Sequence, residues 1–301
     1  MTPRSGNGSR TAVKERVRVR IRVRKRRTFR RRRWLRRLGL IVGLLGVGLA
    51  LDSIWVVTEI ERSMQAARAD IERGAQALLE GDVDSAETAF LLARRAADGT
   101  LGALDHPAGV LARVLPGLSD DTSAVRALAQ AAEKTAEAGS ELARAAEITD
   151  WNGDRAAVLE PGGRVRLGPI AEAAPLIERA ADVLGEARLI LEPVATAGIR
   201  ESIAEALAST KDRIASSEGL TRSAANLARL LPTLLGGDEP RRYLLILQNL
   251  NDPRGSGGFL GIYGILEVTG GRLGLSHLHH AGELPTVPPV DAPRDVRRAY
   301  G

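Results

Sequence analysis

The stretch "ARADIERGAQALLEGDVDSAETAFLLARRAADG", residues 67–99, predicts two α-helices joined by a tight turn. Its Ala, Leu, Glu and Arg residues are among the strongest helix formers. Within "GDVDS", Gly81 is suited to end the first helix, and Asp82 or Asp84 to cap the second. The same composition continues from residue 59 to about residue 235, so most of the chain is predicted to be α-helical.

The small and aromatic residues of this stretch are spaced as in a tetratricopeptide helical hairpin. They are Gly74, Gly81, Ala86, Phe90 and Ala93. A repeat array needs several such units stacked on one another, and the chain has no second copy in register. We therefore expect a single tetratricopeptide-like hairpin, which acts as a packing element rather than as a peptide-binding groove.

Downstream of the hairpin, the pattern predicts further helices separated by breaks. Residues 104–121 contain Pro and Gly and predict a break before a helix over about 122–148, with Ser119, Asp120 or Asp121 as possible caps. An irregular or hairpin insertion is expected over 150–168, followed by helices over about 169–197 and 200–231. From residue 122 to residue 235 there is no histidine, dense acidic cluster or glycine-rich phosphate loop. The helical region 58–235 is thus predicted to be a stalk or an interaction bundle.

Upstream of the hairpin, residues 38–57 read "LGLIVGLLGVGLALDSIWVV" and carry a single charge, on Asp52. Twenty such residues are enough for a helix to cross a hydrocarbon core about 30 Å thick. Trp34 and Trp55 lie near the two ends, as interfacial anchors do. The segment predicts a transmembrane helix. A buried core helix, and signal-peptide cleavage after Ala50, are the alternatives.

The distribution of charge predicts which way the chain faces. Residues 1–37 hold 17 Lys and Arg against one acid, Glu15, whereas the remaining residues hold 26 bases and 36 acids. Basic flanks stay in the cytoplasm, so residues 1–37 are predicted to be a cytoplasmic, largely disordered arm and residues 58–301 to be extracytoplasmic. The arm also suits anionic lipid headgroups of the bilayer. Specific binding of nucleic acid is not expected, because the arm has few aromatic residues and no known reading module.

Two further properties bound the function. With 301 residues, of which 44% are hydrophobic, the chain is long enough for one or two domains with proper cores. It contains no cysteine, which excludes disulfides, thiolate nucleophiles and cysteine-based zinc sites.

The composition changes at residue 236, where we expect the beginning of a glycine-loop α/β or α+β domain, residues 236–301. The run "YLLILQ", residues 243–248, is suited to a strand buried on both faces. "FLGIYGILEV" and "RLGLSHLHH" flank "TGG" and predict a β-hairpin. With Gly270-Gly271 as a two-residue turn, Val268 faces Leu273 and Leu266 faces Leu275. One face of the sheet would then form a core, consisting of Leu260, Ile262, Leu266, Val268, Leu273 and Leu275.

The same pairing places the histidines of the hairpin. It puts His280 opposite Gly261 and His277 opposite Gly264, toward the loop that follows the first strand. His277 and His279 are weak candidates for metal ligands, because Glu283 is the only acid close by. We expect solvated strand-end histidines, with no metal and no cofactor.

The stretch "LQNLNDPRGSGGFLGIYGILEVTGGRL", residues 247–273, resembles the domain of unknown function 4012, an actinobacterial envelope family of unassigned activity. The resemblance lies in a buried strand ending in Gln-Asn, then an acid, an arginine, Gly-Gly-Phe and a hairpin with a glycine turn. The acid of this pattern is usually glutamate and is aspartate here. The matching residues are Gln248, Asn249, Asp252, Arg254, Gly257, Gly258 and Phe259. The resemblance implies an anchored envelope protein whose domain continues past Gly301, so that the chain is expected to hold only its N-terminal part.

Two classes of function are compatible with these features. The first is a non-catalytic envelope component that binds cell-wall polysaccharide or envelope proteins, with Asn249, Arg254, Gly257 and Gly258 as ligand-binding candidates. The second is an enzyme acting on lipid-linked or phosphorylated glycans, by analogy with the LytR-CpsA-Psr transferases. Arg254 would then hold phosphate, Asp252 would act as base or metal ligand, and the amides of residues 255–258 would bind an anion. The alternative is that these residues have only a structural role, as a glycine loop with a local Asp252–Arg254 ion pair.

Overall fold

The described part of the chain begins within the predicted transmembrane segment. The computed structural model describes residues 55–115, 117–154, 158–249, 259–276, 278–284, 294, 297 and 298. All but the first four of these residues belong to one unit, Glu59–Gly301, which is separate from Met1–Thr58. The basic arm 1–37 lies outside the described residues.

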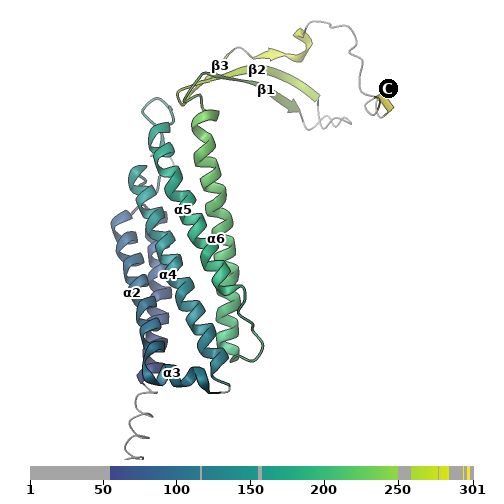
Figure 1. Cartoon of the computed structure of the whole chain (residues 1–301). Coiled ribbons are helices and arrows are strands. Elements are labelled where there is room, and N and C mark those ends of the chain that lie inside the picture. The colour runs from purple at the N-terminus through teal and green to yellow at the C-terminus, as the bar shows by residue number, and fades with distance from the viewer. Residues whose placement is uncertain are drawn as a thin grey trace, which may run out of the picture. The chain divides into compact units, whose positions relative to one another are not determined.

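Six α-helices and a four-stranded sheet make up the described chain, which confirms the mainly α fold class (Figure 1). Five long helices alternate in direction, and the short α3 lies across one end of the bundle they form. The helices are residues 55–80, α2 (Val83–Asp105), α3 (Pro107–Val114), α4 (Ser119–Ile148), α5 (Leu167–Leu191) and α6 (Glu201–Leu234).

No helix among the described residues is long and apolar enough to cross a bilayer. Of the predicted transmembrane segment 38–57, only residues 55–57 are described, and they belong to the helix 55–80. The transmembrane helix therefore stays a prediction.

The turn of the hairpin 67–99 forms as its sequence predicts. Gly81 ends the first helix with a φ of +83°, a backbone conformation that glycine adopts without strain. Of the two acids proposed as caps, Asp82 caps α2, because its Oδ1 accepts a hydrogen bond from the Ser85 amide at 3.0 Å. The short loop brings helix 55–80 and α2 into direct antiparallel contact.

The Phe90 ring joins three helices at the centre of this hairpin. Phe90 is buried on α2, and its ring lies against Gly74 of helix 55–80 and Gly139 of α4. A Cβ atom at Gly74 would lie 2.8 Å from the ring, and one at Gly139 would lie closer still. Both positions must therefore be glycine for the ring to fit, and this contact extends the two-helix unit to a third helix.

Small side chains dominate the core of the bundle. Among the 33 buried apolar residues of the described chain, 23 are alanines. Alanine costs the least to place in a helix, and its small size lets helix backbones approach closely. Larger side chains form one cluster, which includes Leu128 of α4, Leu191 of α5, and Leu207 and Ile214 of α6.

The start of α4 differs from the prediction. The helix begins at Ser119, and Asp120 and Asp121 lie in its first turn without acting as caps. Asp121 is 3% exposed and instead binds Arg200, at the start of α6. It accepts one hydrogen bond from the Arg200 amide at 2.9 Å and one from the guanidinium Nε at 2.6 Å. This contact between segments far apart in sequence ties α4 to the connection between α5 and α6.

The break before α4 and the end of α5 also differ in detail from the prediction. The segment 104–121, expected as a break, contains the eight-residue helix α3. This helix begins at Pro107, and the first position of a helix tolerates proline well. Of the irregular or hairpin insertion expected over 150–168, residues 158–166 form a hairpin, with a bridge between Leu159 and Val165 around the turn at Gly162 and Gly163. The following helix, α5, ends at Leu191, shortly before Pro193, rather than near residue 197.

The sheet is antiparallel, which makes this part of the fold α+β rather than α/β. Strand β2 (Phe259–Thr269) is central, with β1 (Arg241–Asn249) on one side and β3 (Arg272–Leu275) and β4 (His279–His280) on the other. The Gly270-Gly271 turn pairs Val268 with Leu273 and Leu266 with Leu275, as predicted. Both turn glycines have positive φ angles, of 53° and 82°, as a type I′ turn requires.

The predicted register is wrong beyond Leu275. His280 pairs with Ile262 rather than Gly261, and His279 pairs with Tyr263. One extra residue between β3 and β4 shifts the pairing, at the point where the Ser276 amide and hydroxyl both donate to the Ile265 carbonyl. A shift of one residue moves the side chains of His279 and His280 to the face opposite to the one predicted. His277 itself lies outside the described residues.

The predicted burial of the sheet is also largely wrong. On β1, Leu244 is 62% exposed and Ile246 48% exposed, so the strand is not buried on both faces. Of the predicted core face, Val268 is buried, whereas Leu273 and Leu275 are exposed. Ile262 and Leu266 are half-buried. Alternation identifies the residues that share a face, but burial depends on whether another layer covers that face.

We expect Gly139→Ala to lower the free energy of unfolding by about 1–3 kcal/mol, because the added methyl group overlaps the Phe90 ring. The matched control is Gly219→Ala on α6, where no atom lies within 4 Å of the added Cβ, and it should raise stability by about 0.5–1 kcal/mol through helix propensity. Urea unfolding followed by circular dichroism measures both. Phe90→Leu should recover part of the loss in the Gly139→Ala background. A Gly139→Ala protein as stable as Gly219→Ala would contradict this packing.

Candidate functional site

The loop predicted to hold the site joins two neighbouring strands. Asn249 is the last residue of β1 and pairs with Phe259, the first residue of β2, so the connection leaves and returns at one end of the sheet. Asp252, Arg254, Gly257 and Gly258 belong to this connection, which lies outside the described residues. The proposed catalytic and ligand-binding roles of these residues, and of Asn249, remain predictions.

The histidines of β4 lie near the same end of the sheet. His279 pairs with Tyr263, four residues from the start of β2, and the two rings stack with centroids 5.4 Å apart. The Nδ1 atom of His279 lies 3.1 Å from Glu283 Oε2. Within the described ranges, no group of three or more His, Cys, Asp or Glu side chains gathers as metal ligands do. His279 is thus placed in a ring stack and an exposed pair with Glu283.

The connection between the bundle and the sheet depends on the Gly270-Gly271 turn. The Gly270 amide donates to the Gly236 carbonyl and the Gly271 amide to the Leu235 carbonyl, just beyond the end of α6. The turn carbonyls accept hydrogen bonds from Arg164 and from the Val165 amide, both in the 150–168 insertion. The hairpin turn is therefore held by four hydrogen bonds, and a Cβ at Gly271 would strike the Val165 carbonyl.

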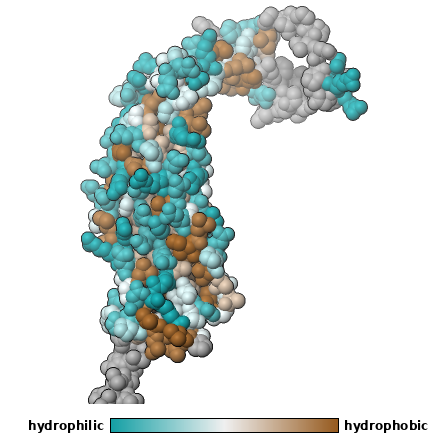
Figure 2. Space-filling view, in the orientation of Figure 1, coloured by the Kyte–Doolittle hydropathy of each residue, from teal (hydrophilic) through white to brown (hydrophobic). Residues whose placement is uncertain are grey.

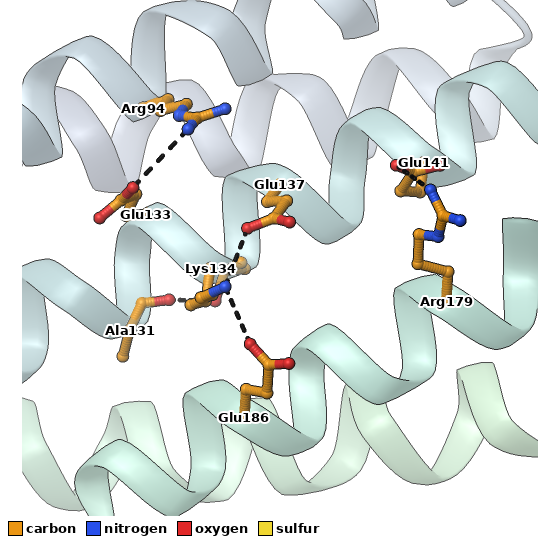
Figure 3. A network of polar contacts seen from close by, with 9 residues as sticks. Arg94, Ala131, Glu133, Lys134, Glu137, Glu141, Arg179 and Glu186 are labelled. Carbon is orange, nitrogen blue, oxygen red and sulfur yellow. Dashed lines mark hydrogen bonds and ion pairs between the residues drawn. The ribbon is translucent and has the colours of Figure 1, made fainter.

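Ion pairs run along α4 and connect it to both neighbouring helices (Figure 3). Arg94 of α2 lies 3.8 Å from Glu133 of α4. Lys134 of α4 lies 3.1 Å from Glu137 on the same helix and 2.8 Å from Glu186 on α5. The hydrogen bonds that Lys134 donates, first to Glu186 and then to Glu137, raise the pKa of Lys134 above its ordinary value. The amine therefore stays protonated at neutral pH and is unsuited to act as a base or nucleophile.

Glu141 lies on α4, about two turns after Lys134, and its carboxylate is buried. Its Oε1 atom lies 3.3 Å from Arg144 and 3.8 Å from Arg179, which reaches across from α5 (Figure 3). The Oε2 atom is buried and has no hydrogen-bond partner among the described residues. With two arginines on its other oxygen, Glu141 serves here to join α4 and α5.

A groove that sequence reasoning missed lies between helix 55–80 and α6. Its volume is about 660 Å³, and its floor is formed by residues of α4 and α5. The sequence carried only one signal for it, the spacing of Arg68 and Glu72 four residues apart, which predicts an ion pair on one helix. The groove is lined by Met64, Gln65, Arg68, Ile71, Glu72, Ala75, Leu128, Ala132, Thr135, Leu184, Ala206, Ser209, Thr210, Arg213, Ile214, Ser216 and Ser217.

Comparison with known proteins identifies a family for one part of the chain. No curated protein and no solved structure matches the chain significantly. Residues 238–301, which include the whole sheet and the glycine-rich connection, match the family described as "Protein of unknown function (DUF4012)". The match confirms the resemblance seen in residues 247–273, and residues 238–301 are hereafter called the DUF4012 segment.

Proposed function

We propose that this protein is a single-pass, membrane-anchored component of the cell envelope whose residues 58–301 lie outside the cytoplasm. The distribution of charge is the observation that carries the proposal. Seventeen basic residues precede the apolar segment 38–57, and a body with an excess of acids follows it. The positive-inside rule then places the basic arm in the cytoplasm and the bundle on the other side of the membrane.

The arrangement of the bundle supports a role as a spacer. Helix 55–80 leads away from the apolar segment, and the last helix, α6, has 34 residues and is about 50 Å long. The sheet attaches to the far end of α6 through the Gly270-Gly271 turn. A long bundle that carries the DUF4012 segment at one end suits a spacer that presents this segment to a ligand.

An exposed apolar surface at the opposite end of the bundle also supports membrane contact. This surface, the α3 patch, is visible in Figure 2 at the end where α3 lies. Ser63 and Thr100 share a hydrogen bond of 2.8 Å, which places the end of α2, and α3 after it, beside the start of helix 55–80. The α3 patch consists of Val110, Leu111, Val114, Leu115 and Leu118, which are 41–76% exposed. Such patches mark interaction surfaces, and we propose that this one contacts the lipid headgroup region.

For the DUF4012 segment, we propose binding of cell-wall polysaccharide or of another envelope protein through the connection 250–258. Arginine suits anionic groups of a wall polymer, and glycines let a ligand approach the backbone. The exposed apolar residues of β1 provide further surface for contact beside this connection. The proposal is made for binding, and the same residues would serve the enzymatic alternative.

The absence of cysteine in the chain makes the orientation directly testable. We expect the single-cysteine variant Leu79→Cys to react with a membrane-impermeant maleimide on intact cells, because Leu79 is 71% exposed at the end of helix 55–80. Ser5→Cys, in the basic arm, should react only after the membrane is permeabilised. The reverse pattern would refute the proposed orientation.

Contact of the α3 patch with lipid can be measured in proteoliposomes of the full chain. An environment-sensitive fluorophore attached at Val114→Cys should be quenched by lipids carrying a spin label in the headgroup region. The same fluorophore at Leu79→Cys, an exposed position at the other end of the bundle, is the control and should not be quenched. If the spin-labelled lipid quenches the fluorophore at Val114→Cys no more than at Leu79→Cys, the α3 patch does not contact the bilayer.

Ligand binding by the 250–258 connection is tested with Arg254→Ala and Asp252→Asn in the full chain. We expect Arg254→Ala to lose sedimentation with purified cell-wall polysaccharide while its circular dichroism spectrum stays unchanged. Arg272→Ala, on the exposed strand β3, is the matched control and should bind as the wild type does. If Arg254→Ala binds equally well, or if the unmodified chain does not bind, the role of this connection in polysaccharide binding is refuted.

A further inference from the structure

The groove between helix 55–80 and α6 is formed by three stripes of side chains at helical spacing. Helix 55–80 contributes Met64, Arg68, Ile71 and Ala75, which recur every three or four residues along one face. Eleven residues of helix separate the first from the last, so the groove is about 16 Å long. Corresponding stripes come from α4, with Leu128, Ala132 and Thr135, and from α6, with Ala206, Thr210, Arg213 and Ser217.

The floor of the groove is apolar and its rim is charged. Leu128, Leu184 and Ile214 are nearly fully buried beneath it, and Met64 and Ile71 are half-buried at its side. A volume of about 660 Å³ falls within the range of about 300–1,000 Å³ that small-molecule sites occupy. An apolar site of this length suits a slender hydrocarbon chain.

The rim has an excess of positive charge. Glu72 Oε1 accepts from Arg213 Nη1 at 2.9 Å and from Arg68 Nε at 3.1 Å, so one carboxylate faces two guanidinium groups. Arg213, and then Arg68, hold the pKa of Glu72 below its ordinary value, which keeps the Glu72 carboxylate ionised at neutral pH. Each guanidinium has five N–H donors, which leaves donors for a second anion beside Glu72.

The ion pair also limits the shape of the occupant. Glu72 and Arg213 come from opposite walls, and their contact of 2.9 Å crosses the groove at its mouth. A partner helix is about 10–12 Å across and could not enter without breaking this contact. A single acyl chain can lie on the apolar floor beneath it.

From these features, we propose that the groove binds a single acyl chain that ends in an anionic head group, with the chain on the floor and the head group at Arg68 and Arg213. Fatty acids and lysophospholipids share this chemistry. The site lies wholly within residues 64–217, so it does not depend on the orientation of the chain or on the ligand of the DUF4012 segment.

The test uses the full chain mixed with lipid nanodiscs and a palmitate that carries a photoactivatable diazirine. After irradiation, mass spectrometry maps the cross-linked peptides. We expect cross-links in residues 64–75, 128–135 and 206–217 of the wild type. Ala206→Trp, which fills the groove, should lose these cross-links, whereas Ala208→Trp should keep them, because residue 208 is exposed on the same helix but does not line the groove.

The head group is tested with two further probes and one further variant. A lysophospholipid with the same diazirine chain should also label the groove, and a labelled fatty alcohol, which has no charge, should label it about tenfold less, as the loss of one charged contact predicts. Arg213→Gln should reduce labelling by palmitate to the level of the alcohol. Labelling by palmitate alone or by lysophospholipid alone identifies the source of the head group and still supports the site. An absence of groove cross-links with every probe, or equal labelling of Ala206→Trp and Ala208→Trp, would overturn the proposal, and equal labelling by palmitate and alcohol would overturn the role of the arginines.

Discussion

The insertion of Phe90 between Gly74 and Gly139 is the contact on which the helical part of the structure depends. An aromatic ring is large and rigid, and here it occupies the space that side chains of two other helices would fill. The two glycines cost helix propensity, of roughly 1 kcal/mol each relative to alanine. The burial of the ring and the close packing of three helices offset that cost. With this contact in place, helix 55–80, α2 and α4 form one unit, and α5 and α6 pack beside it.

An alanine-rich core makes polar contacts between helices more important than in a bundle filled with leucine. Alanine buries little area, so each interface gains little from the hydrophobic effect. Charged side chains between α2, α4 and α5, and the buried contact of Asp121 with Arg200, supply interactions that depend on direction. Exposed ion pairs contribute little each, but a buried carboxylate with two hydrogen bonds to one residue specifies which segments meet. The groove beneath Arg213 and Glu72 exists because α6 packs on α5 while helix 55–80 packs on α2 and α4.

The sheet differs from the bundle in how it is held and in how much apolar surface it exposes. Its attachment uses backbone hydrogen bonds of the Gly270-Gly271 turn, and Gly236 adopts a positive φ of 68° to bring the end of α6 against Val268. Much of the apolar surface of β1 and β3 is exposed. Apolar residues at strand positions normally lie beneath another layer, so these faces are the part of the described chain best suited to further contacts. The exposed residues of β1 adjoin the connection 250–258, which we propose to bind a ligand.

The sequence by itself determined the features that arise from local chemistry. The long helices, the turn at Gly81 with its cap, and the hairpin at Gly270-Gly271 with its first four residue pairs were predictable, because they depend on neighbouring residues. The family motif located the candidate loop in the same way. The tertiary structure alone decided the register of His279, the exposure of Leu244 and the pairing of Asp121, since each depends on which segment packs against it. Arg213 and Glu72 are 141 residues apart, so no local pattern could join them into one groove.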